Sequence, residues 1–136
     1  MSGPVTMTFA PTLRVLEHRL AVCRLPADAP IPAWVLHQSA EFWCLMRTAN
    51  ELSIVCPQDD LPPSIDTVEK PWRVFELVGP VPFTTTGVIA GLTAPLAAAN
   101  VPVFVLSTYD TDYLLVKEQV FAQALGILKA HFSVLE

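Results

Sequence analysis

The sequence of 136 residues predicts an α+β fold in which antiparallel strands form a sheet and the helices lie together on one of its faces. Three observations predict this class. Apolar runs of strand length recur along the chain, and two stretches of the second half carry apolar residues at helical spacing. The predicted elements of residues 70–135 follow the order strand, helix, strand, strand, helix, strand. That order is typical of a split β-α-β, ferredoxin-like unit.

The first half of the chain contains more predicted strand than helix. Residues 13–25 mix apolar and charged side chains, which predicts two strands or one long bent strand. Residues 32–36 predict a short helix that begins at a proline, since proline is tolerated at the first helical position. Residues 41–47 and 51–56 predict a hairpin. The proline-rich stretch 57–64 cannot sustain a helix, because adjacent prolines remove hydrogen-bond donors.

A helix is predicted over residues 88–99, where apolar residues recur at helical spacing. Thr85 or Thr86 is expected to be its N-cap, with the hydroxyl accepting a bond from a free backbone N–H of the first turn. Pro95 lies inside this helix and predicts a kink. Asn100 is expected to close the helix in a left-handed conformation.

The other elements of the second half are four strands and a second helix. Residues 72–78 predict the strand before the first helix, and residues 103–106 and 113–116 predict a hairpin after it. An apolar stripe predicts the second helix over residues 120–129. Residues 131–135 predict a last short strand.

The two predicted hairpins align with each other at a constant offset. Phe42 matches Val103, and Leu45 matches Leu106. Self-similarity of this kind predicts a duplication. We therefore expect two tandem repeats: residues 1–66, which lack the second helix, and residues 67–136, which form a complete unit.

Composition and charge exclude several classes of partner. The net charge is -5 and the isoelectric point is near 5.0, and Lys and Arg form no cluster, which argues against nucleic acid and anionic membranes. Charged residues are only 15% of the chain, so we expect part of the surface to be covered by a second copy, as in a homodimer or a larger homo-oligomer. The first residues lack the pattern of a signal peptide, which predicts a cytoplasmic protein.

No combination of residues predicts a metal, a cofactor or catalysis. The three cysteines are odd in number, are never in C-x-x-C spacing, and are expected to be free thiols. The three histidines are scattered and do not have the spacing of metal ligands. These residues are Cys23, Cys44, Cys56, His18, His37 and His131. Since nucleophile and phosphate-binding motifs are missing as well, the sequence predicts a protein that is not an enzyme.

Residues 79–87, the helix of residues 88–99 and residues 107–117 resemble the ACT-domain family. The resemblance extends over nearly the whole chain. It is closest to small bacterial proteins with two ACT-like repeats, and it extends to the ACT domains of the animal cytosolic arginine sensor. That sensor has two pairs of repeats where this chain has one pair with a shortened first repeat.

The resemblance implies a regulatory domain that binds an amino acid or another small metabolite at an interface between paired ACT domains, where the sheets join side by side. It also implies that Thr108, Tyr109 and Asp112 lie at the ligand interface.

A free amino acid asks for two kinds of partner, and the sequence offers both. Its carboxylate needs N–H donors, which the start of the predicted helix at Thr86, Gly87 and Val88 supplies. Its ammonium needs an anion, and Asp110 or Asp112 can serve. These residues, with Thr108 and Tyr109, form the candidate ligand site.

The sequence leaves structural roles open for the same residues. Asp110 and Asp112 suit a solvated turn, the threonines suit helix capping, and the tyrosines suit sheet packing or a dimer contact. The competing function is a ligand-free homodimer that docks a protein partner. A concave pocket that holds a helix N-terminus and a carboxylate favours the sensor, whereas a flat apolar patch favours the interaction module.

Overall fold

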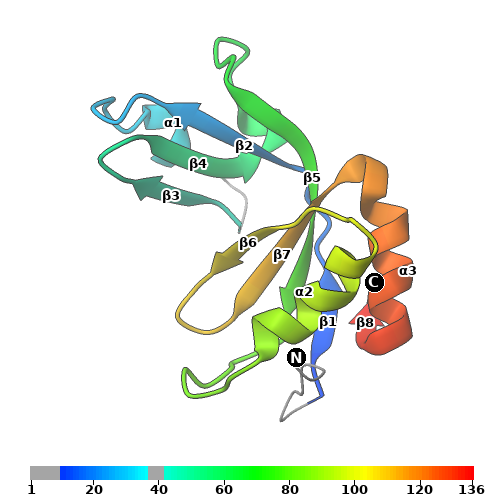
Figure 1. Ribbon diagram of the computed structural model, residues 1–136. Helices are drawn as coiled ribbons and strands as arrows, with labels where there is room; N and C mark the ends of the chain where they lie inside the picture. The colour runs from blue at the N-terminus through cyan, green and yellow to red at the C-terminus, as the bar shows by residue number, and fades with distance from the viewer. Residues whose placement is uncertain (1–9, 37–41) are drawn as a thin grey trace. The chain divides into compact units, whose positions relative to one another are not determined.

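The computed structural model describes residues 10–36 and 42–136, and in it the chain divides into two compact units (Figure 1). One unit, called the inserted unit, is His18–Trp72. The other, called the terminal unit, combines the chain up to Glu17 with Arg73–Glu136. His37, the predicted hairpin start at residue 41 and residues 1–9 lie outside the described residues.

The inserted unit is an antiparallel sheet with one short helix. Its strands have the order β3-β4-β2-β5, and β5 contributes its first residues to this unit. The elements are β2 (Leu20–Leu25), α1 (Ala33–Leu36), β3 (Cys44–Arg47), β4 (Leu52–Pro57), the 3-10 turn η1 (Gln58–Asp60) and β5 (Val68–Leu77). The predicted hairpin and the short helix after Pro32 are thereby confirmed, and of the two alternatives for residues 13–25 the structure has two separate strands.

The core of the inserted unit is small and contains two of the three cysteines. Val35 of α1, Leu52, Ile54 and Cys56 of β4, and Cys23 of β2 are all buried together. Burial raises the pKa of the Cys56 thiol to about 12, with Cys23, Asp60 and Cys44 adding smaller effects in the same direction. The described cysteines are free thiols.

Stability is expected to fall as the pH rises from about 9 toward about 12. The thiol of Cys56 ionises near its ordinary pKa of 9.0 when unfolded, and only near 12 when folded. Between these values the unfolded state gives up a proton that the folded state keeps, so rising pH favours unfolding. Urea midpoints measured from pH 8 to pH 11 test this. The urea midpoint should fall less with rising pH in Cys56→Ala than in the parent protein. An equal fall in the two proteins would contradict the raised pKa of Cys56.

The terminal unit has the predicted order of elements plus one additional strand. It contains β1 (Thr12–Val15), the end of β5, α2 (Val88–Ala98), β6 (Phe104–Ser107), β7 (Asp112–Lys117), the 3-10 turn η2 (Glu118–Val120), α3 (Phe121–His131) and β8 (Ser133–Leu135). Its sheet has the order β6-β7-β5-β1-β8, and α2 and α3 lie side by side on one face (Figure 1). The α+β, ferredoxin-like fold of the second half is confirmed.

Strand β1 is the additional strand, and it changes the division expected from the sequence. It pairs antiparallel with β5, where Leu13 is opposite Leu77, and parallel with β8, where Leu13 is opposite Val134. Leu13 is fully buried in the core of the terminal unit. Residues 12–15, which the predicted boundaries place in the first repeat, therefore fold with the terminal unit. A division into duplicated repeats stays a prediction.

The core of the terminal unit forms where the helices cover the sheet. Val88, Leu92 and Leu96 lie four residues apart on α2 and are buried, as the apolar stripe predicts. They share this core with Ala124 and Leu128 of α3 and with alternate residues of the strands. The strand residues of the cluster are Leu13, Phe75, Leu77, Leu114 and Val116.

The two ends of α2 differ in how well the sequence predicts them. Asn100 has a φ of 59°, and the Val101 N–H donates to the Leu96 carbonyl at 2.9 Å. These observations confirm that Asn100 ends the helix in a left-handed conformation. The predicted threonine N-cap is wrong. Gly87 occupies the cap position with a φ of 77°, a conformation that glycine adopts readily, and no side chain caps the helix.

Pro95 lies within α2, as predicted. Its ring nitrogen cannot donate to the carbonyl of Gly91, four residues earlier, and the helix continues past it to Ala98. None of the described helices is long and apolar enough to cross a membrane.

Candidate ligand-binding site

A cavity of about 410 Å³ lies in the terminal unit where three segments meet. These are the loop before α2, the first turn of α2 and the corner between β6 and β7. The lining residues are Val81, Pro82, Phe83, Thr85, Gly87, Val88, Ile89, Ala90, Ser107, Thr108, Tyr109, Thr111 and Asp112. The volume is in the range of small-molecule sites.

The cavity brings together five of the seven residues that the sequence nominated. Thr86 and Asp110 are exposed and are not among the lining residues. The backbone carbonyl of Asp110 accepts a bond from the Val81 N–H at 2.8 Å, which ties the hairpin corner to the loop before α2. The five nominated residues in the lining are Gly87, Val88, Thr108, Tyr109 and Asp112.

Asp112 is held in place by its neighbour across the hairpin. Ser107 and Asp112 are opposite each other at the ends of β6 and β7, and the Ser107 hydroxyl donates to Asp112 Oδ1 at 2.5 Å. A carboxylate has two oxygens and about four acceptor sites, so one bond leaves capacity for others. This contact fixes the position of the carboxylate at the cavity.

Thr111 anchors the hairpin corner, a role that the sequence reasoning missed. Its side chain is buried, and Oγ1 donates to the Leu77 carbonyl of β5 at 2.6 Å. The Thr108 N–H donates to the Thr111 carbonyl at 2.8 Å, which closes the turn. A Cβ added at Gly79 would lie 3.0 Å from the Cβ of Thr111, so a side chain at this position would require its neighbours to shift by a few tenths of an ångström. The residue type of Thr111 is typical of a turn, but nothing in the sequence identifies the Leu77 carbonyl as its partner.

Thr111→Val is expected to lower the free energy of unfolding by about 1–3 kcal/mol. Valine has nearly the same shape, but it leaves the Leu77 carbonyl without the Thr111 hydroxyl. Urea unfolding followed by circular dichroism measures the change. Thr84→Val, in the exposed part of the loop before α2, is the control and should change stability by less than about 0.5 kcal/mol. Equal losses in the two variants would contradict the anchoring role.

The first turn of α2 lies in the lining of the cavity. The Gly91 N–H is bonded to the Gly87 carbonyl at 2.9 Å, which starts the helical pattern. The first backbone N–H groups of an α-helix have no acceptor within the helix. The helix dipole also makes the N-terminal end attractive to anions. Gly87 has no side chain to block access to them.

Two aromatic rings from separate segments meet at the cavity. Phe83 of the loop before α2 and Tyr109 of the hairpin corner have ring centroids 5.0 Å apart at an interplanar angle of 88°. Both are strongly exposed, at 74% and 81%. Edge-to-face geometry is a favourable arrangement for two rings.

Charge in the described lining is limited to one group. Asp112 is the sole Asp, Glu, Lys or Arg among the residues that line the cavity. Elsewhere, Tyr113 donates to Glu76 Oε2 at 3.3 Å, and Arg14 donates to Glu76 Oε1 at 3.1 Å, across three neighbouring strands. Burial, followed by the nearby Glu76, raises the pKa of Tyr113. Over residues 10–36 and 42–136, His, Cys, Asp and Glu form no group of three that could hold a metal ion.

Comparison with known proteins gives two family matches. A model described as ACT domain matches residues 67–130, and a model described as an N-terminal domain matches residues 18–64. The chain is similar to a protein of Agrobacterium tumefaciens whose crystal structure is known. The two are 33% identical, with a TM-score of 0.84 over 94% of each chain.

Two further relatives carry functional names. The chain is 27% identical over 141 residues to the bovine protein "Cytosolic arginine sensor for mTORC1 subunit 1", and it spans 43% of that protein's length. The aspartate kinase of Clostridium acetobutylicum, described as an allosteric enzyme, has a TM-score of 0.68 at 11% identity, over 96% of this chain and 37% of the kinase. That similarity shows the fold alone. The match of the ACT domain model over residues 67–130 and the 33% identical relative show that the chain belongs to the ACT-domain family.

Proposed function

We propose that this chain is a regulatory module that binds an amino acid at an ACT–ACT interface. The observation that carries the proposal is the cavity of about 410 Å³, whose lining includes both the start of α2 and Asp112. Backbone N–H donors and a carboxylate are the two groups that a zwitterionic amino acid requires. The name of the bovine relative, an arginine sensor, supports a regulatory role for this chain.

The two ends of the ligand would bind at opposite sides of the cavity. Its carboxylate would accept bonds from the N–H groups at Gly87 and Val88, aided by the helix dipole. Its ammonium would donate to Asp112, whose position is fixed by Ser107. Thr108 supplies a further hydroxyl in the lining.

A second copy of the chain would cover the ligand in this proposal. Phe83 and Tyr109 are large apolar groups that one copy leaves strongly exposed at the cavity. Burial of both rings between two copies would close the site and couple ligand binding to the way the copies pack. A ligand that binds one packing arrangement more tightly than another shifts their equilibrium. The module is proposed to act as a cytoplasmic homodimer or larger homo-oligomer.

The test is a thermal-shift screen of the purified protein against each common amino acid. A ligand that binds only the folded state adds about 2.7 kcal/mol of stability at a hundred times its dissociation constant, and it raises the unfolding midpoint. We expect at least one amino acid to do so. If none shifts the midpoint at millimolar concentration, the proposed function fails.

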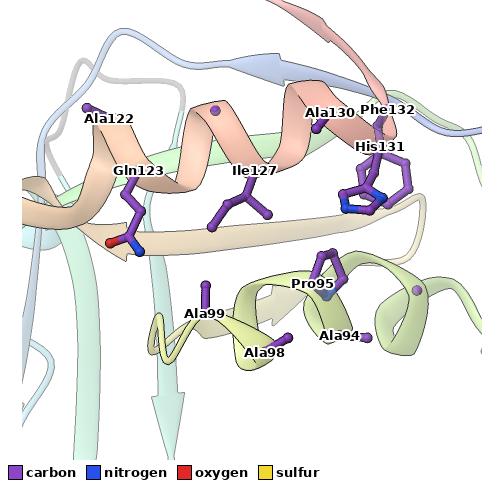
Figure 2. A pocket seen from close by; sticks show the side chains of 12 residues that line it. Ala94, Pro95, Ala98, Ala99, Ala122, Gln123, Ile127, Ala130, His131 and Phe132 are labelled. Carbon is purple, nitrogen blue, oxygen red and sulfur yellow. The ribbon is translucent and has the colours of Figure 1, made fainter.

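One observation favours the competing function, a ligand-free homodimer. The surface between α2 and α3 has an apolar groove, and its lining includes Gly91, Ala94 and Ala98 of α2 and Gly126 and Ala130 of α3. Figure 2 shows Gln123 and Ile127 pointing from α3 toward α2 across it. Small residues allow close helix packing by a second copy. Light scattering on Ala98→Arg and the amino acid screen of the parent protein test this alternative. A ligand-free homodimer predicts that Ala98→Arg loses the dimer and that the parent protein binds no amino acid.

A further inference from the structure

The cavity also indicates which class of amino acid it takes, and this inference rests on the proposed function. We propose that the site selects an amino acid with an uncharged apolar or aromatic side chain. Phe83 and Tyr109 are the residues that recognise this side chain, whereas Asp112 and the start of α2 hold the common backbone groups of the ligand.

The charge of the described lining indicates that the side chain of the ligand is uncharged. An amino acid has an ammonium and a carboxylate, and Asp112 and the α2 N–H groups match them one to one. A side chain with another positive charge needs a second carboxylate, and one with a negative charge needs Lys or Arg. The described lining has neither. Because an unpaired charge is costly to remove from water, the site discriminates against both.

Asp110 does not change this balance. It is exposed, it is not among the lining residues, and its backbone carbonyl is bonded to the Val81 N–H at 2.8 Å. The side chain of Asp110 is therefore not counted among the charges of the described lining in a single copy.

The apolar part of the lining indicates that the side chain of the ligand is apolar or aromatic. Val81, Pro82, Phe83, Ile89 and Tyr109 give one region of the cavity hydrocarbon and aromatic surface. Phe83 and Tyr109 are 74% and 81% exposed, so they have apolar area left to bury. A ligand side chain that packs against both rings removes this area from water as well as its own.

The position of the two rings makes them suited to selection. They belong to different segments, and their centroids are 5.0 Å apart at 88°. The two ring planes are thus nearly perpendicular, and both rings belong to the lining of the cavity that a ligand side chain would enter. An aliphatic or aromatic side chain fits such a corner without an ionic partner.

Isothermal titration calorimetry with leucine, methionine, phenylalanine, arginine, lysine and glutamate tests the inference. We expect the tightest of the three uncharged ligands to bind at least about tenfold more strongly than any charged one. Phe83→Ala and Tyr109→Ala should each weaken that binding about tenfold, the effect of roughly one buried side-chain contact. Met46→Ala, which removes another large exposed side chain from the inserted unit, should leave the affinity unchanged.

The outcomes separate the two proposals. Preferred binding of arginine or lysine, through a carboxylate of the second copy or through stacking on Tyr109, overturns the inference and leaves the proposed function standing. Preferred binding of glutamate does the same. Unchanged affinity in both Phe83→Ala and Tyr109→Ala overturns the assignment of the recognising residues. No binding by any amino acid overturns both proposals.

Discussion

Phe75→Ala is expected to lower the free energy of unfolding by about 3–5 kcal/mol, a larger loss than we expect from Thr111→Val. Phe75 is fully buried on the helix-covered face of β5. Its ring stacks on Phe121 of α3, with centroids 5.4 Å apart and planes inclined by 22°. Alanine removes this contact and leaves a cavity between sheet and helix. Urea unfolding followed by far-ultraviolet circular dichroism measures the loss.

Phe83→Ala is the matched control, because it makes the same chemical change at a side chain that is 74% exposed. Its effect on stability should be within about 0.5 kcal/mol. Since proteins of this size are stable by only about 5–15 kcal/mol, the first variant should show a much lower urea midpoint and the second should not. Similar losses in the two variants would contradict the position of Phe75 in the core.

Asp112→Asn is expected to weaken amino acid binding by at least about 30-fold, whereas the fold is kept. Removal of one partner of a hydrogen-bonded charge pair costs about 2–5 kcal/mol of binding free energy. Asparagine keeps an oxygen that can accept the bond from Ser107, so the hairpin corner loses little. Calorimetry with the ligand found in the screen measures the affinity.

Asp59→Asn makes the same change of charge at an exposed residue of the inserted unit, and it should bind the ligand as the parent protein does. This control separates the local carboxylate from the net charge of the chain. If Asp112→Asn also binds as the parent does, the ammonium is held elsewhere and the geometry proposed for the site is wrong.

The parts of the fold that the sequence predicted are those that depend on neighbouring residues. The stripe of Val88, Leu92 and Leu96 predicts α2 because helical spacing is a local property. Asn100 predicts the end of that helix because a left-handed residue can be recognised from its type. The hairpin of β6 and β7 was found for the same reason: its strands and its polar turn are adjacent in the chain.

The parts that were missed depend on distant residues. Nothing within residues 12–15 indicates that this strand pairs with β5 and β8. Gly87, with a φ of 77°, occupies the N-cap position that the residue types assigned to a threonine. At the candidate site, Asp112 could be nominated from its residue type, but Thr111 could not, because its partner is the carbonyl of Leu77 on another strand.

The location of β1 also affects the order of folding during synthesis and the behaviour of fragments of the chain. Among the described strands β1 is synthesised before all others, whereas β8, one of its two neighbours in the sheet, is synthesised after all others. During translation this strand must therefore remain unpaired on one side until β8 has left the ribosome. A fragment that starts at residue 67 would retain both helices and yet lack the strand between β5 and β8, with two unpaired strand edges open to aggregation.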